Sequence, residues 1–137
     1  MAHDPSFHVL NVLGYNHNLN DLGQMAAKID VIPGTLELLL LKTLSRGRAT
    51  HGFEILRFIR ESTDGELLLE EGALYPALHR MEKRHWIRGE WNVSEKGRRA
   101  KYYTITAAGR AELAREEKAW VRYMQAWDKI ALAATTP

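Results

Sequence analysis

The sequence contains no cysteine among its 137 residues, which excludes disulfide frameworks, thiolate catalysis and cysteine-liganded zinc fingers. It also lacks a long apolar run. The most hydrophobic stretch, Leu36–Leu44, includes Glu37 and Lys42 and is much shorter than the about 18 residues of a membrane span. No basic start followed by an apolar segment is seen at the N-terminus, so we expect no secretory signal. These absences predict a soluble, cytoplasmic protein without a membrane partner.

Residue types that serve in catalysis and metal binding are present, but not at the spacings that such sites need. The six histidines show no His-x-x-x-His pattern and no carboxylate at ligand spacing, so we predict no metal and no cofactor. The pair Glu70 and Glu71 is better explained as favourable negative charge at a helix N-terminus than as an acid and a base. No phosphate-binding glycine loop and no nucleophile elbow occur. The sequence therefore predicts that the protein is not an enzyme.

Charge is unevenly distributed along the chain, although the net charge is only +2. Residues 79–101 contain eight Lys or Arg against three acidic residues. Residues 61–75 contain five acidic residues and no Lys or Arg. Segregation of this kind favours a surface that faces a polyanion over an evenly mixed solvated surface.

Two helices are predicted in the first half of the organised sequence. Thr35 is placed to cap a helix that runs to about Leu44. A second helix opens at Thr50 or His51 and ends before Gly65. The expected buried face of this second helix consists of Phe53, Leu56 and Ile59.

A short strand and a third helix follow. Leu67–Leu69 is long enough only for a strand, and the third helix is predicted from about Gly72 to His85. Pro76 lacks an N–H, so it belongs in the first turn of a helix, which places the start at about Glu71–Ala73. The expected buried stripe of this helix consists of Leu74, Leu78 and Met81.

A hairpin and a last helix complete the pattern. Aromatic and β-branched residues predict strands at 87–93 and 101–106, and residues 94–99 join them as a glycine-containing loop. Thr106 is placed to cap a final helix over 107–132. Heptad spacing on this helix predicts a short seam that faces a second copy of the chain. The seam residues are Leu113, Trp120, Met124 and Trp127.

The fold class predicted from this order is mainly α (α+β), a winged helix-turn-helix with a C-terminal dimerisation helix. We assign residues 1–30 to an N-terminal arm, in which Met25 is hypothesised to be the natural start. Residues 31–106 form the expected DNA-binding domain, and residues 107–137 form the dimerisation helix and tail.

The chemistry that this fold needs is present at the expected places. A major groove of DNA admits one α-helix, and the third helix of the pattern would enter it. Hydroxyl, imidazole and cationic side chains on that helix can reach phosphates or base edges, and cations on the hairpin can follow the DNA backbone or minor groove. The predicted DNA contacts from these two elements are Tyr75, His79, Arg80, Lys83, Lys96, Arg98 and Arg99.

Four segments of the chain share a pattern with known proteins: Pro33–Leu41 (PGTLELLLL), His51–Ile55 (HGFEI), Gly72–Glu82 (GALYPALHRME) and Arg98–Thr106 (RRAKYYTIT). Through these segments the chain resembles the PadR family of bacterial transcriptional regulators over about Ile32–Trp120. The family implies a winged helix-turn-helix that dimerises through its C-terminal helix and usually represses transcription. A single helix after the wing is similar to the small branch of the family, which includes multidrug-responsive regulators.

The resemblance implies roles for particular residues. Tyr75 falls on the tyrosine of the family's recognition helix, and Lys101 and Tyr102 fall on its basic wing strand, which adds both to the predicted DNA contacts. The chain departs from the pattern at Ala73, where the family often has Thr or Ser, and at Ala100, which replaces a basic or polar residue. A structural role for Tyr75 beneath the wing remains an alternative to a phosphate contact.

Trp120 has two open interpretations. The resemblance places it where a drug-binding member carries a tryptophan that stacks flat ligands between two subunits, which implies a small aromatic effector. An aromatic residue at a heptad position is also explained by interface packing alone.

The resulting hypothesis is a homodimeric, sequence-specific regulator of transcription that binds double-stranded DNA. We expect a repressor that binds a pseudo-palindromic operator and is released by a small aromatic ligand. The alternative is a winged-helix module that binds another protein and not DNA.

Overall fold

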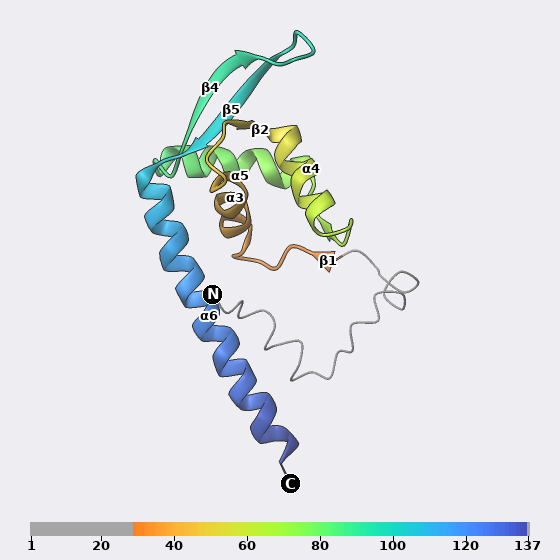
Figure 1. The fold of residues 1–137 in the computed structure, drawn as a ribbon, viewed down its shortest axis with the longest axis vertical. Coiled ribbons are helices and arrows are strands. Elements are labelled where there is room, and N and C mark those ends of the chain that lie inside the picture. The colour runs from red at the N-terminus through yellow and green to blue at the C-terminus, as the bar shows by residue number, and fades with distance from the viewer. Residues whose placement is uncertain (1–28, 137) are drawn as a thin grey trace. The chain divides into compact units, whose positions relative to one another are not determined.

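The computed structural model describes residues 29–136, and Figure 1 draws and labels their elements. The chain divides into two compact units, and the last helix crosses the boundary between Ala114 and Arg115. The predicted arm and Met25 lie outside the described residues, apart from the first short strand. In chain order the elements are β1 (Ile29–Asp30), α3 (Leu36–Leu44), β2 (Thr50–His51), α4 (Gly52–Ser62), β3 (Leu67–Leu68), α5 (Glu71–Lys83), β4 (Ile87–Val93), β5 (Arg99–Ile105) and α6 (Ala107–Thr135).

This order confirms the predicted mainly α, winged helix-turn-helix fold. Two further strands, β1 and β2, were not predicted, because two residues are too few to show a period. β2 joins the hairpin to make a three-stranded antiparallel sheet in the order β2-β5-β4, and β1 pairs with β3 in parallel. The hairpin of β4 and β5 extends well beyond the helices and forms the wing (Figure 1).

The core lies between α3, α4, α5 and the base of the wing. The predicted stripe of α5 is confirmed, and the prediction for α4 is wrong at Phe53, whose surface is 57% exposed. Ile55 is buried in its place, and Phe53 lies about 200° from it around the helix axis, on the side facing water. The largest fully buried side chains are Leu40, Leu41, Leu44, Ile55, Leu74, Leu78, Met81 and Thr50.

Two threonines were predicted to cap helices, and only one does so. Thr35 occupies the N-cap position of α3, but its hydroxyl donates to the carbonyl of Ile32 at 2.7 Å and makes no side-chain capping bond. Thr106 does cap α6: its hydroxyl oxygen accepts from the Gly109 N–H at 3.0 Å. The same hydroxyl donates to the carbonyl of His85 at 2.6 Å, which ties the start of α6 to the end of α5.

Pro76 lies one turn later in its helix than predicted. The predicted start of α5 is confirmed at Glu71, but Pro76 is then the sixth helical residue and not part of the first turn. The carbonyl of Gly72 consequently has no N–H to accept from four residues later. Gly72 is exposed, so water can satisfy this carbonyl, and the helix continues to Lys83.

The long helix α6 begins within the winged-helix unit. The side chain of Leu113 is only 7% exposed and belongs to the core of that unit. Leu113 is therefore used within its own chain, which corrects its assignment to the seam with a partner.

Among residues 29–136, no helix combines the length and apolar character needed to cross a membrane.

Candidate nucleic-acid interface

Helix α5 has one wholly buried side and one exposed side. Leu74, Ala77, Leu78 and Met81 have no exposed surface, because they pack into the core. The opposite side of the helix is largely exposed, although single side chains on it contact α3, α4 and the wing. The predicted contact residues on that side, all of them exposed, are Tyr75, His79, Arg80 and Lys83.

The ring of Tyr75 lies against the first residue of α4. A Cβ atom built on Gly52 would be 2.8 Å from both Cε1 and the hydroxyl oxygen of Tyr75, so only glycine leaves room for the ring. Tyr75 is nevertheless 46% exposed. The residue thus combines a packing role between α4 and α5 with an accessible surface, and the two interpretations of Tyr75 do not exclude each other.

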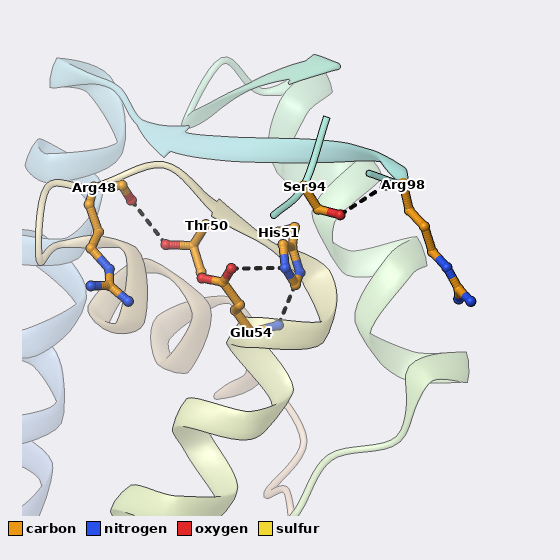
Figure 2. A network of polar contacts seen from close by, with 6 residues as sticks. All are labelled: Arg48, Thr50, His51, Glu54, Ser94 and Arg98. Atoms are coloured by element: carbon orange, nitrogen blue, oxygen red, sulfur yellow. Dashed lines mark hydrogen bonds and ion pairs between the residues drawn. The ribbon is translucent and has the colours of Figure 1, made fainter. Parts of the chain in front are cut away.

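His51 caps the start of α4, as Figure 2 shows. Its Nδ1 accepts from the Glu54 backbone N–H at 3.2 Å, and its Nε2 lies 2.8 Å from Oε1 of Glu54. The ring of Tyr102 meets the His51 ring edge-on, with 5.4 Å between centroids. The sequence predicted that Thr50 or His51 opens this helix, and the structure identifies His51. The pairing with Glu54 was not predicted, although a polar residue three positions before a glutamate is the spacing of a capping box.

Arg80 is held by an acidic residue of α3. Its guanidinium lies 3.0 Å from Oε1 of Glu37 and is half exposed. The pair ties the recognition helix to α3, so part of the charge of Arg80 is already balanced before any nucleic acid is bound.

The cations of the wing are arranged differently. The loop is closed by the Ser94 N–H, which donates to the Arg98 carbonyl at 2.7 Å, and Gly97 takes the left-handed conformation (φ +73°) that this turn needs. The side chain of Arg98 points away from the loop (Figure 2). The guanidinium of Arg99 lies 5.0 Å over the ring of Trp91. In the described part of the chain, no acidic side chain forms an ion pair with Lys96, Arg98 or Arg99, and all three are exposed.

Lys101 lies on β5, as Arg99 does, but unlike Arg99 it has a carboxylate partner among residues 29–136. Its Nζ is 2.7 Å from Oε1 of Glu82 on α5, and the hydrogen bond to Glu82 raises the pKa of Lys101. Its positive charge is balanced within the protein, unlike the charges at the tip of the wing.

Nothing within residues 29–136 gathers three or more histidine, aspartate or glutamate side chains into a group that could hold a metal ion. The negative charges of Glu70 and Glu71 instead occupy the N-cap and the first position of α5. There they interact favourably with the helix dipole, as their sequence position predicted. The exposed chemistry of this face is therefore hydrogen-bonding and cationic, which suits a phosphate backbone and base edges.

The sequence and the fold match known regulators. Residues 40–115 match the model of the transcriptional regulator PadR-like family. A transcriptional regulator from Clostridium thermocellum is 29% identical, with 70% of this chain and 92% of that one covered and a TM-score of 0.64. A PadR family regulator from Clostridium difficile is 28% identical, with 71% and 98% covered and a TM-score of 0.62. A PadR-like regulator from Bacillus cereus is 28% identical, with 71% and 91% covered and a TM-score of 0.61.

The family match spans more than half of the chain, and the fold carries the recognition helix and basic wing that DNA binding requires. The chain belongs to the PadR-like family of transcriptional regulators, which are DNA-binding proteins and not enzymes.

Proposed function

We propose that the protein is a cytoplasmic repressor that binds a pseudo-palindromic operator as a homodimer. Helix α5 enters the major groove, and the wing follows the DNA backbone or the adjacent minor groove. The observation that carries this proposal is the division of α5 into a fully buried stripe and an exposed face, beside a wing tip whose cations Lys96, Arg98 and Arg99 form no ion pair within residues 29–136. The proposed DNA contacts are Tyr75, His79, Arg80, Lys83, Lys96, Arg98, Arg99 and Tyr102.

The proposal of a dimer is supported by the aromatic surface of α6. Trp120 and Trp127 are 40% and 45% exposed, one heptad apart, and the ring of Tyr123 stacks on that of Trp120 with 6.4 Å between centroids. Large aromatic residues in water favour burial against a second apolar surface. An identical α6 from a second chain, with Met124 in the same seam, supplies that surface. Two recognition helices would then meet major-groove faces about one helical turn apart.

DNA binding is tested by fluorescence anisotropy with labelled DNA from upstream of the protein's own coding sequence. We expect tighter binding to this DNA than to a shuffled fragment of equal length, and a steep fall in affinity as salt is raised. Equal affinity for both fragments would contradict sequence-specific regulation. A complex with a protein partner that is insensitive to salt, without DNA binding, would favour the alternative of a protein-interaction module.

Replacing Trp120 by alanine should weaken the dimer. A central aromatic residue in an interface typically contributes about 2 kcal/mol or more, so we expect the dimer dissociation constant to rise about 30-fold. Sedimentation velocity over a dilution series measures this change. The matched control is Arg122→Ala on the same helix, which should leave the constant unchanged; an unchanged constant for Trp120→Ala as well would exclude the seam.

The finer hypothesis is that a flat aromatic effector stacks on Trp120 and releases the operator. It requires the ligand to bind the released state more tightly than the DNA-bound state. Titration of the protein–DNA complex with candidate aromatic compounds, followed by anisotropy, tests it. If the protein stayed bound to DNA with every compound, the hypothesis of an aromatic effector would be contradicted, and the proposed DNA-binding role would be unaffected.

A further inference from the structure

An ion pair joins the recognition helix to the wing. Glu82 lies in the last turns of α5 and Lys101 lies in the middle of β5, and their charged atoms approach to 2.7 Å. Both side chains are about three-quarters buried, with 24% of Glu82 and 27% of Lys101 exposed. A pair shielded to this degree is screened less by salt than an exposed pair and holds its geometry more firmly.

Strand β4 leaves a gap through which this pair forms. Gly89 stands opposite Tyr103, and the next cross-strand pair on the same face of the hairpin is Trp91 with Lys101. A Cβ atom on Gly89 would overlap the aliphatic stem of Lys101 and lie 3.1 Å from Oε2 of Glu82. The stem of Lys101 therefore crosses the wing where β4 has no side chain, and glycine in this strand is explained by that close approach.

The surroundings of Lys101 favour its charged form within the protein. The hydrogen bond that Lys101 donates to Glu82 raises the pKa of Lys101, and the Lys101 ammonium also lies 5.7 Å from the centre of the Tyr103 ring. A cation with a carboxylate on one side and an aromatic ring beside it has little net positive field left to offer a phosphate. The tip of the wing differs, since Lys96, Arg98 and Arg99 have no carboxylate in an ion pair among residues 29–136.

We propose that Lys101 is a positioning residue and not a phosphate contact: with Glu82, across the gap at Gly89, it sets the angle between the wing and helix α5. This inference rests on the proposed function, since the angle matters only if both elements meet the same DNA. It differs from the role that the family resemblance implied for Lys101, which was a contact from a basic wing strand.

A charge-swap cycle tests the role of the pair in DNA binding. Lys101→Glu brings two carboxylates together and Glu82→Lys brings two ammonium groups together, so each should lower affinity for the upstream DNA about tenfold. The double variant restores an ion pair with reversed polarity and should recover most of the lost affinity. If Lys101 contacted a phosphate instead, Lys101→Glu would not be rescued by Glu82→Lys, and the inference would be overturned.

The dependence of binding on salt distinguishes a positioning residue from a phosphate contact. Lys101→Met keeps the length of the stem and removes the charge. We expect lower affinity at every salt concentration, with the slope of log affinity against log salt unchanged. A slope reduced by about 0.9 would mean that one phosphate contact had been lost, which would contradict a positioning role.

The wing angle can also be measured without DNA, which separates this inference from the proposed function. The chain has no cysteine, so spin labels can be placed at Lys83→Cys on α5 and Glu95→Cys on the wing loop. Electron–electron distance measurements, with labelled protein diluted into unlabelled protein, should give one narrow distribution for the otherwise native chain. Lys101→Met should broaden it and the charge-swapped double variant should narrow it again. Equal widths in all three proteins would overturn the inference even if DNA binding is confirmed.

Discussion

Replacing Gly109 by alanine should lower the free energy of unfolding by about 2 kcal/mol or more, and the melting temperature by roughly 10 °C. A Cβ atom at this position would overlap the carbonyl oxygen of Trp86 and lie 2.9 Å from Cγ1 of Ile105. The Trp86 carbonyl cannot simply move away, because it accepts from the Thr106 backbone N–H at 3.0 Å. Relief of the overlap therefore requires the start of α6 to separate from the base of the wing.

The effect is measured by thermal and urea denaturation, followed by circular dichroism at a fixed protein concentration, since dimerisation makes stability depend on concentration. Gly72→Ala is the matched control. Gly72 is also helical, but a Cβ there would meet nothing within 4 Å. Alanine is the better helix former, so this control should be neutral or stabilise the protein by up to about 1 kcal/mol. If the two variants were equally stable, the close approach of Gly109 to Trp86 would not exist in solution.

Gly109 also illustrates what the sequence could not predict. A glycine in the first turn of a helix looks unfavourable when only helix propensity is considered. Glycine is needed here because of the Trp86 carbonyl, which lies 23 positions earlier in the chain. This carbonyl packs against Gly109 only after the hairpin has folded. The existence and order of the long elements were predictable, because α5 and α6 repeat their apolar residues with a helical period and the wing strands are rich in aromatic and β-branched residues.

Side-chain pairing within the candidate site was harder to predict. Whether Lys101 faces a phosphate or Glu82 depends on the rotation of β5 about its axis relative to α5, and a basic residue in a wing strand is compatible with both. The error at Phe53 has the same origin, since a shift in the rotation of α4 exchanges Phe53 for Ile55 in the core. The exposure of the wing-loop cations was easier to predict, because a tight turn at the end of a hairpin keeps its side chains in water.

Those loop cations should account for a large share of the affinity for DNA. Removing Arg98 and Arg99 together, with alanine at both positions, should reduce the slope of log affinity against log salt by about 1.8, because each lost phosphate contact removes about 0.9. At 0.1 M salt this corresponds to an affinity roughly 60-fold lower, and the difference should shrink as salt is raised. Anisotropy titrations with the upstream DNA and with the shuffled fragment, at four or more salt concentrations, measure both quantities.

The matched control removes two positive charges from elsewhere on the chain. Arg122→Ala with Lys129→Ala changes the net charge equally, at exposed positions of α6 that are not proposed to contact DNA. If the loss of affinity came only from the reduced overall charge, both double variants would lose the same amount. Contact by the wing predicts a reduced slope for the first variant alone, and by the same amount for both DNA fragments, because phosphate contacts do not distinguish sequences. If the slope of the Arg98 and Arg99 double variant fell on the upstream DNA only, the arginines would read bases instead of phosphates. If its slope were unchanged on both fragments, α5 would bind DNA without help from the wing.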